Sequence, residues 1–185
     1  MKKVSLDKKY IFAIDPGNME SGYVLVSAGD LQPILMAKED NHEVLDVLRG
    51  LIEELPANSL ELVIEMVASF GMPVGREVFD TCVWIGRFIQ CAGDKGIGHA
   101  SYITRMQEKL AICHNPHAND ATIKQALIDR FAYGQKNYGK GTKKDPGWFY
   151  GFKADIWSAY AIAVTWSDLY GEKDDQQSSI AWTAG

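Results

Sequence analysis

Cysteines, long apolar runs and a secretory leader are scarce or absent in this sequence, and each scarcity argues against a class of protein. The three cysteines, Cys82, Cys91 and Cys113, are odd in number and show no C-x-x-C spacing, which favours reduced thiols over a disulfide or zinc framework. No apolar run approaches the roughly 20 residues that cross a bilayer. The lysine-bearing start, MKKVSLDKKY, is not followed by the apolar segment of a signal peptide. We therefore expect a cytoplasmic protein without membrane contact.

Length and composition fit one domain with a sizeable core. The chain has 185 residues, of which 46% are hydrophobic and 23% are charged. The stretch after Gly171, EKDDQQSSIAWTAG, is polar. We predict a single domain over residues 1–171 and a flexible tail over residues 172–185.

The net charge of −5 hides an uneven distribution of charge along the chain. Residues 95–153 carry ten lysines and arginines against four acids, whereas residues 1–94 carry eight against fifteen. Such asymmetry allows one basic face to attract a polyanion while the rest of the protein stays acidic.

The chain is organised around the stretch YIFAIDPGNMESGYVLV, residues 10–26. Its first apolar run predicts a buried strand that ends at Asp15, and Pro16-Gly17 then turns the chain into a second strand. A carboxylate at the end of a buried strand is held rigidly at a sheet edge, as a metal-dependent nuclease or a phosphate-handling enzyme requires. An ordinary Asp-Pro-Gly turn is the alternative interpretation.

Two further acids stand at comparable places. The run LELVI, residues 60–64, predicts a short buried strand that ends at Glu65. Asp155 lies in the first turn of ADIWSAYAIAVTWSDLY, an almost wholly apolar helix that must pack against the sheet. An acid in that turn complements the helix dipole, so Asp155 could also be no more than a capping group.

The remaining pattern predicts an α/β fold, with a mixed five-stranded sheet flanked by helices. Further strands are expected over residues 31–38, where Pro33 favours an edge position, and over residues 99–104. Helical spacing or capping residues predict helices after Asn41 and over residues 76–92 and 105–113, and another that begins after Asn119 or Asp120.

The stretch GQKNYGKGTKKDPGWFYG, residues 134–151, differs in kind because it is rich in glycine, lysine and aromatic residues. We predict a mobile loop that contacts phosphates through lysine and bases through ring stacking. A solvated connection without function is the alternative. The lysines of this loop are Lys136, Lys140, Lys143 and Lys144.

Three acids at one sheet edge repel one another unless a cation lies between them. Mg²⁺ binds a few carboxylates and leaves positions free for phosphate and water, and we expect Mn²⁺ to substitute for it. Two such ions, roughly 3.5–4 Å apart, would activate a water and stabilise the leaving 3′-oxygen of a phosphodiester.

Four segments together resemble the RuvC-like Holliday junction resolvases of the RNase H-like superfamily. They are AIDPGNMESGYVLV, LVIEMVASF, YITRMQEKLAIC followed by HANDATIKQAL, and KADIWSAYAIAVT, in family order over nearly the whole chain. The resemblance implies an RNase H-like nuclease domain and an Mg²⁺-dependent endonuclease, usually a homodimer, that cuts branched DNA symmetrically on two strands. The loop GTKKDPGWFYG is longer than in the bacterial form of the family, so the chain resembles a divergent phage or prophage member.

The resemblance also implies roles for individual residues. Asp15, Glu65 and Asp155 would be the catalytic metal-binding acids, and Lys109 falls near the basic residue of the family that contacts the scissile region. Phe70, five residues after Glu65, is a candidate for stacking in an opened junction, and a loop aromatic that covers the core is the alternative. The full set of predicted DNA-binding residues is Phe70, Arg105, Lys109, Lys124, Lys136, Lys140, Lys143 and Lys144.

The sequence departs from the family at two places. The last helix of the family commonly carries two metal-site positions three residues apart, whereas this chain has Asp155 and then Ser158. Because residues three apart share a helix face, Ser158 is expected to face the metals and at most to orient a metal-bound water. Asp120 stands where a basic residue is more usual.

Three other functions fit parts of the pattern. An RNase H-like ATPase needs two copies of the fold around its nucleotide, and this chain holds one, so we expect no nucleotide cofactor. A YqgF-type RuvC-like nuclease acting on RNA shares the opening motif. A DNA-structure-binding protein whose nuclease centre has decayed would explain Ser158. If the protein is a dimer, the expected interface is the helix over residues 76–92, through Val78, Val83, Trp84 and Phe88.

Overall fold

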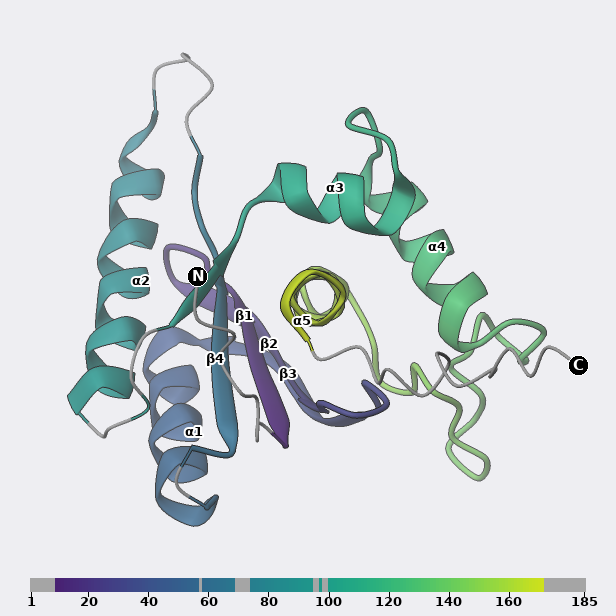
Figure 1. Ribbon diagram of the computed structural model, residues 1–185, viewed down its shortest axis with the longest axis horizontal. Helices are drawn as coiled ribbons and strands as arrows, with labels where there is room; N and C mark the ends of the chain where they lie inside the picture. Colours follow the sequence, from purple (N-terminus) through teal and green to yellow (C-terminus); the bar gives the residue numbers. More distant parts are fainter. Residues whose placement is uncertain (1–8, 57, 69–73, 95–96, 98–99, 172–185) are drawn as a thin grey trace, which may run out of the picture.

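The computed structural model describes residues 9–56, 58–68, 74–94, 97 and 100–171, and Figure 1 shows the arrangement of their strands and helices. Phe70 and the tail over residues 172–185 lie outside the described residues. In chain order the elements are β1 (Tyr10–Asp15), β2 (Glu20–Ser27), β3 (Pro33–Asp40), α1 (Asn41–Glu54), β4 (Leu60–Glu65), α2 (Arg76–Asp94), β5 (Ser101–Ile103), α3 (Arg105–Cys113), α4 (Asp120–Phe131) and α5 (Ile156–Tyr170).

The five strands form one mixed sheet in the order β3-β2-β1-β4-β5. Strands β1, β2 and β3 pair antiparallel, whereas β4 runs parallel to β1 and β5 runs parallel to β4. This architecture confirms the predicted α/β fold with a mixed five-stranded sheet. Pro33 begins β3 at the sheet edge, as expected for a residue that cannot donate to a ladder.

The central strand β1 is buried on both faces, because Ile11, Phe12, Ala13 and Ile14 are all fully inaccessible to solvent. Alternate residues point to opposite faces of the sheet. Phe12 and Ile14 pack in a cluster with α1 and α2, whereas Ile11 and Ala13 pack in a cluster with α4 and α5. Figure 1 shows α1 and α2 on one side of the sheet and α5 on the other.

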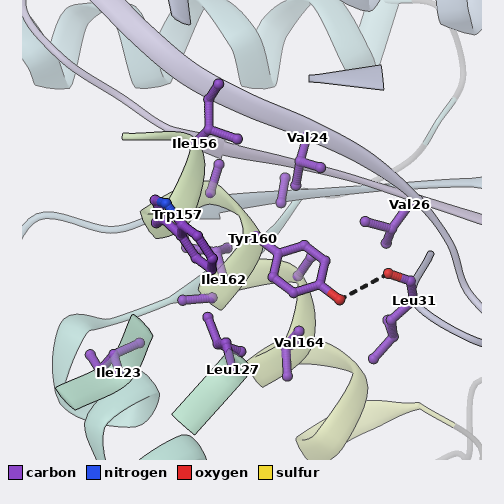
Figure 2. Packing of buried hydrophobic residues seen from close by; sticks show 14 of the residues in the cluster. Val24, Val26, Leu31, Ile123, Leu127, Ile156, Trp157, Tyr160, Ile162 and Val164 are labelled. Carbon is purple, nitrogen blue, oxygen red and sulfur yellow. Dashed lines mark hydrogen bonds between the residues drawn. The ribbon is translucent and has the colours of Figure 1, made fainter. Parts of the chain in front are cut away.

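Helix α5 is buried almost all round, as its apolar sequence predicts. Figure 2 shows how its side chains fill the space between the sheet and α4. The Tyr160 hydroxyl donates a hydrogen bond to the Leu31 carbonyl over 3.0 Å, which ties the helix to the turn after β2. Among the described residues, no helix combines the length and apolarity needed to span a membrane.

The expectation of a mobile loop over residues 134–151 is wrong for its second half. Phe149 is fully buried against Trp157 and Tyr160, and Trp148 stacks on Phe131 with ring centroids 5.4 Å apart. The Trp148 indole also donates to the Tyr160 hydroxyl. The physical reason is that these large rings gain more by burial on α5 than they could in solvent.

The predicted interface on α2 is also wrong in part. Phe88 is fully buried and Trp84 packs on it and on His42, so both serve the core and are not free for a partner. Val78 is half-buried. The exposed apolar side chains of α2 are Phe79 and Val83, at 60% and 61% exposure. Of the four predicted interface residues, Phe88 is therefore excluded, Val78 and Trp84 are half-buried, and Val83 remains exposed beside Phe79.

Candidate active site

Asp15 and Glu65 lie at the same edge of the sheet. Strands β1 and β4 are parallel and pair Ile14 with Ile64, so their next residues, Asp15 and Glu65, stand at neighbouring carboxyl ends. A pocket of about 240 Å³ opens beside Glu65 and is lined by Pro16, Glu65, Met66, Val67, Ala68 and Arg105. The structure therefore brings the two strand-end acids together beside an accessible space.

Asp155 reaches this edge from α5 because β2 carries a glycine beneath it. A Cβ added at Gly22 would lie 2.6 Å from the Asp155 carbonyl oxygen and 2.8 Å from the Asp155 Cβ. Gly22 is also the cross-strand partner of Asp15. Asp155 is the N-cap residue of α5, but its side chain makes no capping hydrogen bond and pairs with Lys38 instead.

Burial and neighbouring acids shift the pKa values of Asp15 and Glu65. Burial raises the pKa of Asp15 to about 8, and the charge of Glu65, a hydrogen bond to Glu65 and the charge of Asp155 act in the same direction. Burial and the charge of Glu108 raise the pKa of Glu65. A proton shared between Asp15 and Glu65 thus reduces the repulsion between the two carboxylates, and a divalent cation would reduce it further.

Ser158 lies one turn into α5 on the face that contains Asp155. Its hydroxyl hydrogen-bonds to the Asp15 carboxylate, a contact that lowers the pKa of Asp15 and so opposes the larger effect of burial. Ser158 therefore contributes a neutral hydrogen-bond donor to the site, where a carboxylate would add a fourth negative charge.

Lys38 is a member of the site that our sequence analysis did not identify. It lies on β3 opposite Gly22, and Gly22 lies opposite Asp15, so Lys38, Gly22 and Asp15 form one row across the sheet. The Lys38 ammonium binds Asp155 at 2.8 Å and Glu20 at 3.5 Å. The hydrogen bond and charge of Asp155 raise the pKa of Lys38. A predicted strand alone does not show which neighbouring residue a lysine will face.

Within the described part of the chain, no three His, Cys, Asp or Glu side chains stand as a finished set of metal ligands. Asp155 is bound by Lys38, which holds one of the three acids in an ion pair. The chemistry of the donor set nevertheless fits a hard divalent cation, since the acids offer carboxylate oxygens, and burial and neighbouring negative charge raise the pKa values of Asp15 and Glu65.

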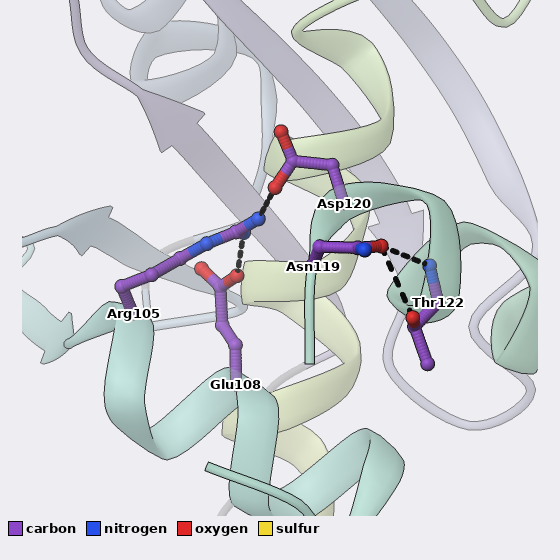
Figure 3. Close-up of polar contacts among 5 residues, drawn as sticks. All are labelled: Arg105, Glu108, Asn119, Asp120 and Thr122. Carbon is purple, nitrogen blue, oxygen red and sulfur yellow. Dashed lines mark hydrogen bonds and ion pairs between the residues drawn. The ribbon is translucent and has the colours of Figure 1, made fainter. Parts of the chain in front are cut away.

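Arg105, at the start of α3, is engaged in ion pairs on both sides of its guanidinium. One nitrogen, Nη1, donates to Glu108 and the other, Nη2, donates to Asp120 (Figure 3). Thr104 caps α3 and Asn119 caps α4, which fixes the two helix starts that carry these residues. Arg105 therefore lies beside the pocket at Glu65, with its charge already shared between two acids.

Glu108 is a second residue that the sequence analysis missed. Its side chain is fully buried, and the charge of Asp15 contributes to raising its pKa. The signal was its spacing four residues before Ile112, which packs against the core and marks the inner face of α3. A pair three residues apart, such as Arg105 and Glu108, looks in sequence like an ordinary surface ion pair.

The other predicted DNA-binding residues lie outside the acidic centre. Lys109 lines a groove of about 510 Å³ with Arg105, His117, Ala118, Asn119, Asp120 and Ala121. The Lys124 ammonium lies over the Trp157 ring, 5.1 Å from its centroid. In the glycine-rich stretch, Lys136, Lys143 and Lys144 are exposed and Lys140 is half-buried.

Comparison of the fold with solved structures finds similar structures, among them two of one protein, RuvC. A structure of Thermus thermophilus RuvC matches with a TM-score of 0.58 at 16% identity, covering 86% of this chain and 93% of RuvC. T. thermophilus RuvC in complex with a Holliday junction substrate matches with a TM-score of 0.59 at 14% identity, covering 86% and 92%. The fold is therefore the RNase H-like fold of RuvC. No protein-family model and no curated protein sequence matches the chain.

Proposed function

We propose that this protein is a divalent-metal-dependent endonuclease that cleaves branched DNA, acting as a Holliday junction resolvase. The observation that carries the proposal is the convergence of Asp15, Glu65 and Asp155 at one sheet edge of a RuvC-like fold. The Holliday junction substrate in the complex of the similar T. thermophilus protein supports branched DNA as the substrate class.

Asp15, Glu65 and Asp155 would hold the metal, with Ser158 hydrogen-bonded to Asp15. When bound, two Mg²⁺ or Mn²⁺ ions supply an activated water and neutralise charge on the leaving oxygen in phosphodiester hydrolysis. A cation that binds Oδ2 of Asp155 would displace the Lys38 ammonium from it. Lys38 would then be free to contact a DNA phosphate, because its ammonium is already positioned at the sheet edge.

DNA would lie along the basic side of the molecule. The groove that contains Lys109 adjoins the acidic centre through Arg105, which lines both this groove and the pocket beside Glu65. The exposed lysines Lys136, Lys143 and Lys144 extend the positive surface beyond α4. The exposed rings of Tyr133, Tyr138 and Tyr150 offer stacking surfaces for unpaired bases at a branch.

A homodimer would supply two cleavage centres for the two opposed strands of a junction. We assign its interface to the exposed stripe of α2 that includes Phe79 and Val83, which lie four residues apart on one helix face. Both are large apolar side chains that the monomer leaves in solvent.

A DNA-structure-binding protein without cleavage is the second candidate. Two observations favour it: Ser158 adds no charge to the centre, and Lys38 already neutralises Asp155. Such a protein would bind junctions equally well with and without a divalent metal.

The test is an assay of purified protein with Mg²⁺ or Mn²⁺ on labelled four-way junction, flap, linear duplex, RNA/DNA hybrid and RNA substrates. We expect paired, symmetric cuts in the four-way junction and loss of cutting in Asp15→Asn, Glu65→Gln and Asp155→Asn with junction binding retained. Binding without cutting at any metal concentration would establish the second candidate. Preferential cutting of RNA would show an RNA nuclease.

A further inference from the structure

The carboxylate of Glu108 is buried and only partly satisfied. None of its side chain is exposed to solvent. Arg105 donates to its Oε2, but Oε1 has no hydrogen-bond partner among the described residues. Buried polar atoms are almost always paired in folded proteins, so an unpaired carboxylate oxygen calls for an explanation.

The ion pair with Arg105 does not by itself provide that explanation. Arginine–carboxylate pairs are frequently bidentate, with one hydrogen bond to each carboxylate oxygen. Arg105 instead gives one nitrogen to Glu108 and the other to Asp120 (Figure 3). This division holds the Glu108 carboxylate in place while leaving one oxygen available.

Glu108 also lies within electrostatic reach of the acidic centre. Its charge raises the pKa of Glu65, and the charge of Asp15 raises that of Glu108. Burial raises the pKa of Glu108 to about 7 even though Arg105 opposes the shift. Helix α3 packs against α5, the helix that carries Ser158. Glu108 thus approaches the centre from an element that supplies none of its other three acids.

We propose that Glu108 is the fourth carboxylate of the metal centre and binds a divalent cation through Oε1, while Arg105 retains Oε2 and positions the group. This inference rests on the proposed metal-dependent nuclease function. It gives the centre the charge that the neutral Ser158 does not provide. It also assigns Arg105, which holds Oε2, as a positioning residue.

Binding of Mn²⁺ to the DNA-free protein tests the assignment without a cleavage assay. The free Mn²⁺ concentration is read by electron paramagnetic resonance during a titration at constant pH. We expect Glu108→Gln, which preserves the shape of the side chain, to weaken Mn²⁺ binding at least tenfold. Asp120→Asn is the matched control, because it removes a carboxylate from the same arginine on the exposed side. Its Mn²⁺ affinity should remain within twofold of the unsubstituted protein.

A rescue separates a ligand from a merely structural residue. In the Glu108→Gln background, Ser158→Asp should recover most of the lost Mn²⁺ affinity, because it returns a carboxylate to the centre from α5. A structural defect on α3 would not be repaired by a charge on α5. If Glu108→Gln fails to fold, Glu108→Asp provides the second variant, since it retains the charge but withdraws it by one methylene and should still weaken binding.

The outcomes distinguish this inference from the proposed function. Normal Mn²⁺ affinity in a folded Glu108→Gln protein would overturn the role of Glu108 and leave the three-acid nuclease intact. An equal loss in Glu108→Gln and Asp120→Asn would also overturn it, because the effect would then belong to Arg105. Absence of Mn²⁺ binding in the unsubstituted protein would overturn the metal centre itself, and Glu108 with it.

Discussion

The backbone of Asp155 lies directly on Gly22, so closely that a Cβ at Gly22 would be 2.6 Å from the Asp155 carbonyl oxygen. Gly22 has Asp15 as its cross-strand neighbour on one side and Lys38 on the other. Because Gly22 has no side chain, Asp155 at the start of α5 can lie between the Asp15 carboxylate and the Lys38 ammonium. The contact determines both the position of Asp155 and the seating of α5 on the sheet.

Replacing Gly22 with alanine should displace Asp155 from the site. The added methyl would meet backbone and Cβ atoms of Asp155, which cannot yield as a flexible side-chain end does. We expect a loss of about 1–3 kcal/mol in the free energy of unfolding, as for overpacking elsewhere, and at least a tenfold fall in junction cleavage. Chemical denaturation and single-turnover cleavage measure the two effects.

Gly29→Ala is the control for this substitution. Gly29 lies in the turn after β2, and an added Cβ there would have no atom within 4 Å. It should leave stability and cleavage nearly unchanged. A Gly22→Ala protein with normal cleavage would mean that the position of Asp155 above β2 does not matter to the reaction.

Much of the frame around the site could be predicted from sequence because it depends on local patterns. The apolar runs before Asp15 and Glu65 indicated two buried strands, and parallel pairing of β1 with β4 then placed both acids at one edge. The almost wholly apolar sequence of α5 likewise indicated a buried helix. These features follow from burial and side-chain period, which a single sequence carries.

The missing members of the site depend on tertiary contacts that local patterns do not carry. Lys38 joins the centre through strand register, since it shares a row with Gly22 and Asp15. Glu108 is fully buried on α3, a helix that packs against α5. Phe149 was expected in a mobile loop, although the aromatic side chains of α5 provide a site that buries it. In each case the partner lies far away in sequence.

Asp15→Asn should stabilise the protein at alkaline pH when no metal is present. The folded-state pKa of Asp15 is about 8, against an ordinary value of 3.8, so the folded state favours the protonated form. Its contribution to stability is complete below about pH 4 and is lost as the pH rises through 8. Asparagine stays neutral and can still donate to Glu65, so its advantage should grow with pH and reach a few kcal/mol by pH 9, at about 1.4 kcal/mol per pKa unit.

Urea denaturation in EDTA from pH 5 to pH 9 measures this advantage. Mg²⁺ provides the internal control, because a cation that binds the acids of the folded state stabilises the unsubstituted protein. Its addition should reduce the difference in free energy of unfolding between Asp15→Asn and the unsubstituted protein at pH 9. A difference between the two proteins that stays constant across this pH range would show that Asp15 ionises normally in the folded state.

Replacing Lys136, Lys140, Lys143 and Lys144 together with alanine should weaken junction binding and flatten its salt dependence. Each phosphate contact contributes roughly 0.9 to the slope of log K against log salt on duplex DNA. Three of these lysines are exposed and the fourth is half-buried, so we expect the slope to fall by about 2 to 3. Fluorescence anisotropy in EDTA at several salt concentrations measures it.

Lys9 and Arg49 supply the control pair for this set. Arg49 lies on α1, on the opposite side of the sheet from α5, and pairs with Asp46. Alanine at both positions should leave the slope unchanged. If the loop variant also kept its slope, then Lys109 and Lys124 would be the better candidates for phosphate contacts.

Val83→Glu should convert a homodimer into monomers. Val83 is 61% exposed and lies four residues after Phe79 on α2, so a charge there would be buried without a partner if two copies of this helix meet. Light scattering at micromolar concentration should report half the mass of the unsubstituted protein. Ile34→Glu, which places the same charge on an exposed apolar position of β3, should not change the mass. A monomeric unsubstituted protein, with and without junction DNA, would contradict the proposed dimer.

Lys38→Met should tighten metal binding in the absence of DNA. The Lys38 ammonium holds Asp155 at 2.8 Å, and its raised pKa keeps it charged across the working pH range, so it competes with a divalent cation for that carboxylate. The pair is partly exposed, and such ion pairs contribute about 0.5–1 kcal/mol, which corresponds to a gain of roughly two- to fivefold in Mn²⁺ affinity. Lys143→Met, which removes an exposed ammonium from the loop, should change the affinity little. Weaker Mn²⁺ binding in Lys38→Met would mean the reverse relationship, in which the lysine holds Asp155 in the orientation that the metal requires.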